Sequence, residues 1–578
     1  MKKISLFFKS FVFVFFTYPL NTLLIVLLSI CEGLIPASLA LIMKNLVDTI
    51  LVSSNIDLQR FAILVILWLC IMIAAQAVST VLRVVIDVYK LKLANNISEQ
   101  IIQKRLSFFG IALFEDEAFL KVYNRLENTH IAIENFINNF RFVCKSGVEF
   151  ISLFIIFTQF EFWVPLVIFV SIIPGIFTAR KISAMQVEQD DLYYDNERII
   201  SYYRNALITP NNAREIHIFD FGNLFFTKFK NYSQNFFKQN KKYRTKIAAY
   251  DFIAVIARIC GAGFLMFVLS KDAAAGKISA GLFAMFMQSV FSFSTAMLEI
   301  IEFWSYLDSA LEYFKKLFDF FTMPDTLRIA EKPKSINGTI HSIEFRNVSF
   351  GYSADKKVLD NISFKIHAGE ITALVGENGA GKSTLIKLLA RFYDPSSGDI
   401  FINEVNLKDL DLLEYRKKLS AVFQDYVKYN VSARENIFAC EHSMQKPTDK
   451  VDLNFCSELE KGFDTELGTY LGGVELSGGQ WQRIAIARGL AKPHEIFLVD
   501  EPTAAIDPIQ ERTIYESLLQ GHETVLLVTH RLGSVRRADR ILVLQNGMLL
   551  ASGSHADLMA QCPYYNRLYS SQADMYRE

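Results

Sequence analysis

A glycine-rich loop flanked by two apolar segments is the part of this chain with the clearest capacity for chemistry. Ile371–Val375 predicts a buried strand before the loop, and Leu385–Leu389 predicts a helix after it. Glycines let backbone N–H groups approach phosphate oxygens, while Lys382 can reach β- and γ-phosphates and Ser383 can offer a hydroxyl to Mg²⁺. A short motif also arises by chance, so neighbouring motifs must support this interpretation. The predicted nucleotide-binding residues of the loop are Gly376, Glu377, Asn378, Gly379, Ala380, Gly381, Lys382, Ser383 and Thr384.

Two carboxylates follow a second predicted strand. Ile496–Val499 is a short apolar run bounded by polar residues, which is typical of a buried strand. It leads into Asp500, which can hold Mg²⁺ directly or through water, and Glu501, which can orient and polarise an attacking water. The alternative is a pair of solvated carboxylates at a strand end. The phosphate-binding loop upstream favours a site that hydrolyses a nucleotide.

The segment Leu476–Gln480, with the sequence LSGGQ, lies between these two motifs and precedes a predicted helix, Trp481–Arg488. Ser477 supplies a hydroxyl, and the glycines permit close backbone approach to an anion at the positive end of the helix dipole. The alternative is a helix cap made of Ser and Gly. Two phosphate cradles in one molecule are most useful when they face each other across a two-fold interface, so the pattern predicts a dimer. The residues predicted to complete the partner's site are Ser477, Gly478, Gly479 and Gln480.

The order of these three motifs resembles that of the ATP-binding cassette (ABC) transporter family. The resemblance covers essentially the whole chain and implies that ATP and Mg²⁺ are the ligands. It places Tyr352 against the adenine, Gln424 between Mg²⁺ and the membrane domain, and Asp507 across the dimer interface. It makes His530 the switch histidine at the γ-phosphate, so Glu501 and His530 are the predicted catalytic residues. The Mg²⁺ contacts that it implies are Ser383, Gln424 and Asp500.

The first half of the chain is rich in apolar segments. Hydrophobic residues make up 51% of the sequence and the formal net charge is zero, which argues against a nucleic-acid partner. Apolar windows of about 20 residues match a bilayer core of roughly 30 Å. The third and fourth segments are short and closely joined, so a single broken span is the alternative to six. The predicted spans are Asn21–Met43, Phe61–Leu82, Val148–Phe160, Trp163–Phe177, Ile247–Leu269 and Ile278–Leu298.

Charge patterning predicts how these spans cross the lipid bilayer. Three lysines precede the first span, and the long segments 90–145 and 180–246 are rich in Lys and Arg, as is typical of cytoplasmic regions. Both termini are therefore expected in the cytoplasm, in a multi-pass protein of the cytoplasmic membrane. The start of the chain imitates a signal peptide but continues into a full span. Residues 3–17 are expected to form an amphipathic helix at the inner surface.

Together with the family resemblance, these patterns predict a polytopic α-helical membrane domain with the type IV ABC exporter fold, followed by an α/β P-loop ATPase domain. The expected boundaries are 1–317 for the six-span membrane domain, 318–337 for a linker and 338–578 for the ATPase domain. By position, Phe108–Phe119 and Pro210–Phe221 match the family's two coupling helices. The resemblance implies a homodimer that alternates between inward- and outward-facing states.

The residues around LSGGQ carry the only indication of cargo. Gly472–Glu475 and Trp481 resemble the corresponding residues in exporters of ribosomally made modified peptides, which favours peptide export. Trp481 can also be a packing residue. A lipid flippase, a multidrug exporter and one half of a heterodimeric exporter are the alternatives.

Ionisable residues inside predicted spans are candidates for substrate contact, because charge is costly in lipid. Glu32 lies in the first span and Arg258 in the fifth. We expect both to face a central cavity and affect substrate choice, with Glu299 or Glu302 balancing Arg258. The alternative is structural pairing with neighbouring helices.

Overall fold

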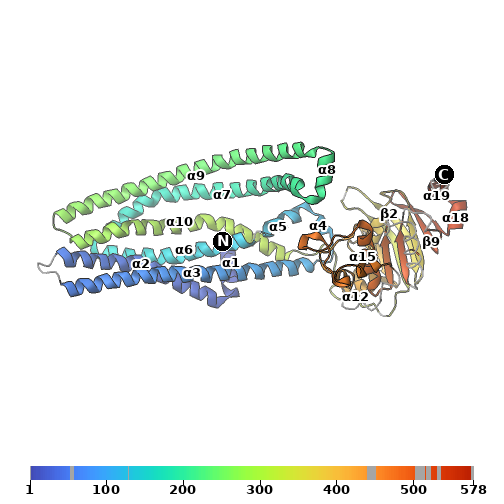
Figure 1. Cartoon of the computed structure of the whole chain (residues 1–578), viewed down its shortest axis with the longest axis horizontal. Coiled ribbons are helices and arrows are strands. Elements are labelled where there is room, and N and C mark those ends of the chain that lie inside the picture. Colours follow the sequence, from blue (N-terminus) through green and yellow to red (C-terminus); the bar gives the residue numbers. More distant parts are fainter. Residues whose placement is uncertain are drawn as a thin grey trace. The chain divides into compact units, whose positions relative to one another are not determined.

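The chain divides into two compact units (Figure 1). The computed structural model describes residues 2–51, 57–127, 129–336, 338–353, 355–438, 451–501, 515, 523–529 and 535–574. The first unit comprises Met1–Ser107 and Glu117–Met323, and the second comprises Phe108–Asp116 and Pro324–Glu578. The expected membrane domain, 1–317, differs from the first unit in two ways. Its last helix continues to Thr322, and residues 108–116 belong to the second unit.

The first unit is built from long helices in its described residues. Such helices satisfy their backbone hydrogen bonds within the segment, which a chain surrounded by lipid requires. The helices are α1 (Lys2–Thr17), α2 (Pro19–Leu51), α3 (Leu58–Leu106), α5 (Glu117–Glu127), α6 (Thr129–Phe160), α7 (Val164–Ile208), η1 (Pro210–Asn212), α8 (Ala213–Ile218), α9 (Phe221–Ala274) and α10 (Ala280–Thr322).

Five of the described helical segments are long and apolar enough to cross a membrane. Helix α6, which contains the predicted third span, is not among them. The apolar run Val148–Phe160 would cover only about 20 Å of a bilayer core of roughly 30 Å. The helices α6 and α7 are separate and pack mainly on different neighbours, which favours two spans over a single broken one. The five segments are Pro19–Leu51, Leu58–Leu106, Val164–Ile182, Phe221–Ala274 and Ala280–Ile301.

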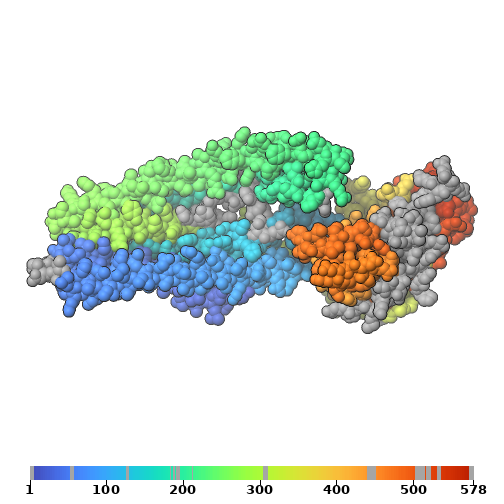
Figure 2. Space-filling view, in the orientation of Figure 1, coloured from blue at the N-terminus to red at the C-terminus, as the bar shows by residue number. Residues whose placement is uncertain are grey.

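The helices of the first unit form two groups. Helices α2, α3, α6 and α10 pack together, whereas α7 packs chiefly on α9 (Figure 1). A Cβ at Gly33 of α2 would lie 2.4 Å from the carbonyl oxygen of Lys145, so glycine permits the close approach of α2 and α6. Phenylalanines pack within the bundle, where the partly buried Phe150 stacks on the buried Phe293 at 5.0 Å between ring centroids. In the space-filling view, α8 and α9 form one edge of this unit and α3 lies along the other (Figure 2).

Helix α1 packs on this bundle through one face. Val14 and Phe15 are buried, while Phe8 and Phe16 are exposed. The hydroxyl of Tyr89 in α3 donates a hydrogen bond of 2.6 Å to the carbonyl oxygen of Val14. The helix therefore combines a packed face with an exposed apolar face, as expected for a helix that lies at a membrane surface.

The second unit contains two sheets and the helices around them. One sheet is antiparallel, in the order β2-β1-β4-β5, and the other has the order β10-β9-β3-β8-β7-β6. The strands are β1 (Ser342–Phe350), β2 (Leu359–His367), β3 (Ile371–Val375), β4 (Ser397–Ile402), β5 (Val405–Asn406), β6 (Leu419–Val422), β7 (Ile496–Asp500), β8 (Thr524–Val528), β9 (Arg540–Gln545) and β10 (Met548–Gly553). The main helices are α4 (Ala112–Glu115), α11 (Lys382–Leu389), α12 (Leu412–Lys417), α13 (Ala433–Phe438), α14 (Asn454–Ser457), α15 (Gly478–Ala491), α18 (His555–Gln561) and α19 (Pro563–Asp574).

Parallel pairing in the second sheet brings the predicted motifs to one edge. Strands β3 and β7 are both parallel to β8, which lies between them. All residues of β7 are buried, in agreement with the predicted apolar strand. Because the carboxyl ends of parallel strands lie at the same edge, the glycine loop after β3 and the carboxylates after β7 come together. The predicted α/β P-loop architecture is thus confirmed.

Candidate nucleotide-binding site

The loop between β3 and α11 closes tightly on itself. The Lys382 ammonium donates hydrogen bonds of 2.9 Å to the carbonyl oxygens of Gly376 and Glu377. Gly381 has φ = 100°, and a Cβ there would lie 2.5 Å from a side-chain carbon of Leu359. Burial lowers the pKa of Lys382, an effect that the nearby acidic groups oppose. The loop thus holds a buried cation beside exposed backbone, as a phosphate site requires.

Side chains from three segments converge beside this loop. The Ser383 hydroxyl, at the start of α11, donates a hydrogen bond of 3.2 Å to Oδ1 of Asp500 at the end of β7. Gln424, shortly after β6, donates a hydrogen bond of 3.1 Å to Oε2 of Glu501. Burial raises the pKa of Asp500. The structure therefore brings together the four residues that were predicted to contact Mg²⁺ or water.

This set of oxygen atoms fits a hard divalent cation. Mg²⁺ prefers carboxylate, hydroxyl, amide and phosphate oxygens. Asp500 is only 6% exposed, and its carboxylate is directed at the Ser383 hydroxyl. A buried carboxylate held by one hydroxyl is a suitable place for a cation, because the ion would offset the cost of burying the charge.

Tyr352 provides an aromatic face at one end of the loop. Its hydroxyl lies 3.2 Å from the hydroxyl of Thr384, and 47% of the residue is exposed. The ring packs edge-on against Tyr393, with centroids 5.4 Å apart. The Lys387 ammonium lies 5.3 Å from the centroid of Tyr352. The position of this ring, next to the phosphate-binding loop and partly open to solvent, suits stacking against a nucleotide base.

The LSGGQ segment forms the start of α15. Ser477 and Gln480 make a capping box, in which the Ser477 side chain accepts from the Gln480 backbone N–H at 3.3 Å. The predicted alternative, a helix cap, therefore describes the local role of Ser477 within one chain. The hydroxyl of Tyr426 also donates a hydrogen bond of 3.1 Å to the carbonyl oxygen of Gly478. These contacts fix the helix start while leaving Gly478 exposed.

Trp481 is a core residue. It is 1% exposed and packs with Ile484, Phe497 and other apolar side chains under α15. Core packing is therefore sufficient to account for a tryptophan at this position, without any role in the choice of cargo.

Two predicted site residues, Asp507 and His530, lie outside the described residues. The predicted substrate residues lie in the first unit, in helices α2 and α9. Glu32 accepts hydrogen bonds of 3.0 and 2.9 Å from Arg141 of α6, and both side chains are largely buried. Glu299, one of the two acids expected to balance Arg258, accepts a hydrogen bond from Ser146.

Sequence reasoning placed a coupling helix in Phe108–Phe119 but gave none of the contacts by which residues 108–116 belong to the second unit. The guanidinium of Arg416 donates a hydrogen bond of 2.9 Å to the carbonyl oxygen of Phe109, and Ile111 donates one of 3.2 Å to the carbonyl oxygen of Phe392. Tyr393 donates a hydrogen bond of 2.6 Å to Glu115. These partners lie far apart in the sequence and share no local motif that could have indicated them.

Comparison with known proteins agrees with the geometry. The family model described as "ABC transporter" matches residues 359–504. The subtilin transport ATP-binding protein SpaT of Bacillus subtilis is 32% identical over 64% of this chain and 62% of its own length. The nisin transport ATP-binding protein NisT of Lactococcus lactis is 30% identical over 65% of each chain. An ATP-dependent lipid A-core flippase of Alcanivorax borkumensis is 31% identical over 74% of each chain. The matches to SpaT and NisT thus span slightly less than two thirds of those relatives.

A solved structure extends the likeness in fold to nearly the whole chain. The bacterial Atm1-family ABC exporter with ATP bound has a TM-score of 0.83, with 22% identity over 96% of this chain and 98% of its own. Fold and site together define a membrane protein with a helical domain and a P-loop nucleotide-binding domain. The chain belongs to the ABC transporter family.

Proposed function

We propose that this protein is an ATP-driven exporter that works as a homodimer in the cytoplasmic membrane. The observation that carries the proposal is the convergence of Ser383, Asp500 and the pair Gln424–Glu501 beside the Lys382 loop. ATP would lie with its phosphates in the loop and its base on Tyr352. Ser383, Asp500 and Gln424 would hold Mg²⁺, which when bound offsets the negative charge of the phosphates.

Each residue then has a distinct part in hydrolysis. Lys382 neutralises charge on the β- and γ-phosphates. Glu501 orients the attacking water and accepts its proton, while Gln424 fixes the carboxylate of Glu501. The water oxygen bonds to the γ-phosphorus as the bond to the β–γ bridging oxygen breaks. We assign His530 to the γ-phosphate by its place in the motif order.

A second copy completes the site in this proposal. Ser477, Gly478, Gly479 and Gln480 would face the γ-phosphate bound by the partner, and Asp507 would contact the partner across the interface. The start of α15 supports this role because its helix dipole favours an anion. Closure around two nucleotides would turn the cavity outward, and hydrolysis would return it inward.

The segment between α7 and α9 supplies a second link between copies. Ile208, Ile218 and Phe219 are 68%, 78% and 64% exposed around η1 and α8. The second unit has a cavity of about 710 Å³, lined in part by Phe392 and Arg416. We propose that this segment of one copy docks in that cavity of the other, which transmits closure to the membrane helices.

Peptide is the proposed cargo. The support comes from SpaT and NisT, whose names refer to transport of subtilin and nisin. Export of a lipid is the second candidate, because lipid A-core flippases match a comparable share of the chain. Glu32 and Arg258 are proposed to affect the choice between them. The membrane orientation, with both termini in the cytoplasm, follows from the distribution of Lys and Arg.

Purified full-length protein tests this function. We expect a mass of two copies, Mg²⁺-dependent ATPase activity and ATP-driven uptake of a modified peptide into inverted vesicles. Glu501→Gln should preserve ATP binding and slow hydrolysis by about 10² to 10⁴-fold, whereas the exposed control Glu458→Gln should behave as wild type. An inactive monomer would overturn the homodimer. Uptake of a lipid but no peptide would overturn the proposed cargo.

A further inference from the structure

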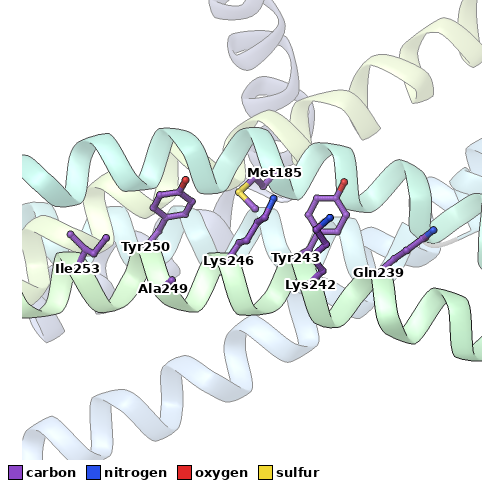
Figure 3. Close-up of a pocket in the computed structure, with 8 residues that line it drawn as sticks. All are labelled: Met185, Gln239, Lys242, Tyr243, Lys246, Ala249, Tyr250 and Ile253. Atoms are coloured by element: carbon purple, nitrogen blue, oxygen red, sulfur yellow. The ribbon is translucent and has the colours of Figure 1, made fainter.

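A pocket of about 670 Å³ lies between α7 and α9 of the first unit (Figure 3). Met185 lines it from α7, and the remaining described lining residues come from α9. In Figure 3 the side chains of Tyr243, Lys246 and Tyr250 extend from α9 toward α7. This volume falls in the range of small-molecule sites, which is roughly 300 to 1,000 Å³.

The described residues that line the pocket carry two positive charges and no negative charge. Lys242 and Lys246 are one helical turn apart on α9, and both line the pocket. Lys181 of α7 lies beside it, with its ammonium 5.3 Å from the centroid of Tyr250. Neither Lys242 nor Lys246 forms an ion pair within the described part of the chain. The segment 221–250 has seven Lys or Arg residues and no Asp or Glu, so this stretch of α9 offers no acid to neutralise them.

The two helices place the pocket at a boundary between apolar and polar sequence. On α7 the apolar sequence gives way to Arg180 and Lys181, one turn before Met185. On α9 the lysines give way directly to the predicted span that begins at Ile247. Both helices therefore leave the hydrocarbon region at the level of this pocket. Tyrosines at this level match the aromatic belt at membrane interfaces, where amphipathic rings lie among lipid headgroups.

The wall of the pocket changes from polar to apolar along α9. Gln239 and Lys242 line one end, whereas Ala249 and Ile253 line the other. Ile253 is 52% exposed, so the apolar end opens toward the surface. A ligand that fits this gradient carries a negative charge at one end and a hydrocarbon chain at the other. A small soluble anion would leave the apolar end unused.

We propose that this pocket binds the phosphate headgroup of an anionic phospholipid in the cytoplasmic leaflet. Lys242 and Lys246 pair with the phosphate, the tyrosine rings flank it, and an acyl chain runs past Ala249 toward Ile253. Basic pockets between membrane helices on the cytoplasmic side are suited to such headgroups. The inference rests on the proposed membrane orientation, and it assigns a lipid site separate from the nucleotide site.

Native mass spectrometry of the purified full-length dimer tests the site with phosphatidylglycerol as the probe. Lys242→Gln/Lys246→Gln should weaken binding by roughly 30-fold. Each lysine near an anionic headgroup contributes about 1 kcal/mol of binding free energy, and the loss of two such contributions corresponds to this factor. The matched control is Lys241→Gln/Arg244→Gln, which removes two exposed charges from the same turns without touching the pocket lining. The control should lose less than threefold. Ala249→Trp, which fills the pocket and keeps both lysines, should also abolish binding.

Equal losses in the two double variants would show attraction to a general basic surface and would overturn the site. If phosphatidylcholine binds as tightly as phosphatidylglycerol, the pocket does not select anionic headgroups. If inorganic phosphate competes at equal concentration, the ligand of the pocket is a free phosphate and not a lipid. Peptide cargo displacing the lipid would reassign the pocket to transport. Because the same spectrum reports dimer mass, failure of the homodimer is visible separately from failure of lipid binding.

Discussion

The carboxylate of Glu115 accepts a hydrogen bond of 2.6 Å from the hydroxyl of Tyr393. Burial and the adjacent Glu115 raise the pKa of this phenol, so it remains protonated and able to donate. The Tyr393 ring in turn contacts Tyr352, the proposed platform for the base. One buried aromatic residue thus joins the segment 108–116 to the nucleotide end of the second unit.

Tyr393→Phe removes the donated hydrogen bond and keeps the ring against Tyr352. We expect ATPase activity within about twofold of wild type. Transport per ATP should fall about fivefold, as for the loss of roughly 1 kcal/mol at a hydrogen bond to a half-exposed charge. Parallel assays of phosphate release and vesicle uptake give this ratio.

Tyr470→Phe is the control for that experiment, because Tyr470 is 87% exposed. It should leave the transport-to-ATPase ratio unchanged. If Tyr393→Phe reduces hydrolysis and uptake in the same proportion, the hydrogen bond supports the nucleotide site alone and does not link it to transport.

Local sequence patterns predicted the nucleotide site well because its parts follow strand ends. A short apolar run predicts the strand that leads to Gly376, and another predicts the strand that leads to Asp500. Parallel pairing brings the ends of these two strands together. The bond from Tyr393 to Glu115 joins residues 278 positions apart. No local pattern encodes such a contact, because only the folded chain brings its partners together.

The membrane helices show a second limit of sequence patterns. A hydropathy window counts Arg141 and Lys145 of α6 as unfavourable, so the predicted third span begins only after them. In the fold Arg141 contacts Glu32 of α2, and Lys145 lies 3.9 Å from Glu299 of α10. Charges that are neutralised by neighbouring helices can lie in a bundle at lower cost, and sequence alone does not pair them.

Asp500→Asn should change the pH dependence of stability. Since burial raises the pKa of Asp500 above its unfolded value, the folded state binds the proton more tightly. Its contribution to stability is therefore present at low pH and lost as pH rises through the folded pKa. Without nucleotide or Mg²⁺, the variant should unfold about 2 °C higher than wild type at pH 8 and at nearly the same temperature at pH 4. Thermal unfolding followed by intrinsic fluorescence measures both values.

Addition of Mg²⁺ and ATP separates this effect from a general change in packing. The wild-type protein should gain stability at pH 8, where the carboxylate is ionised, and the variant should gain much less. Equal stabilisation of both proteins by Mg²⁺-ATP would contradict the assignment of Asp500 to the cation.

Trp481→Ala should destabilise the second unit by about 3 to 5 kcal/mol, because it empties a large part of the core beneath α15. Trp481→Phe should cost about 1 to 2 kcal/mol, since the indole N–H has no hydrogen-bond partner among the described residues and only volume is lost. Denaturant unfolding ranks the two variants. Trp481→Phe should retain its cargo preference in vesicle uptake, and a switch of cargo would mean that this residue does more than pack.

The ion pair between Glu32 and Arg141 joins helices α2 and α6. Its side chains are 16% and 19% exposed, and two oxygens of Glu32 accept from one Arg141 nitrogen. Removing one partner leaves an uncompensated charge between α2 and α6, whereas removing both leaves none. Glu32→Gln and Arg141→Gln should therefore each destabilise the protein by about 2 to 3 kcal/mol, and the double variant should be more stable than either single variant. Thermal unfolding in detergent measures this coupling.

The same variants decide whether Glu32 contacts cargo. If the pair is purely structural, the double variant recovers both stability and the wild-type order of preference among peptide and lipid cargoes. If Glu32 lines the cavity, the double variant recovers stability while its cargo preference stays altered, because the carboxylate facing the substrate is still missing. Arg258→Gln provides the comparison from α9. An unaltered preference in both stable variants would remove Glu32 and Arg258 from the proposed substrate site.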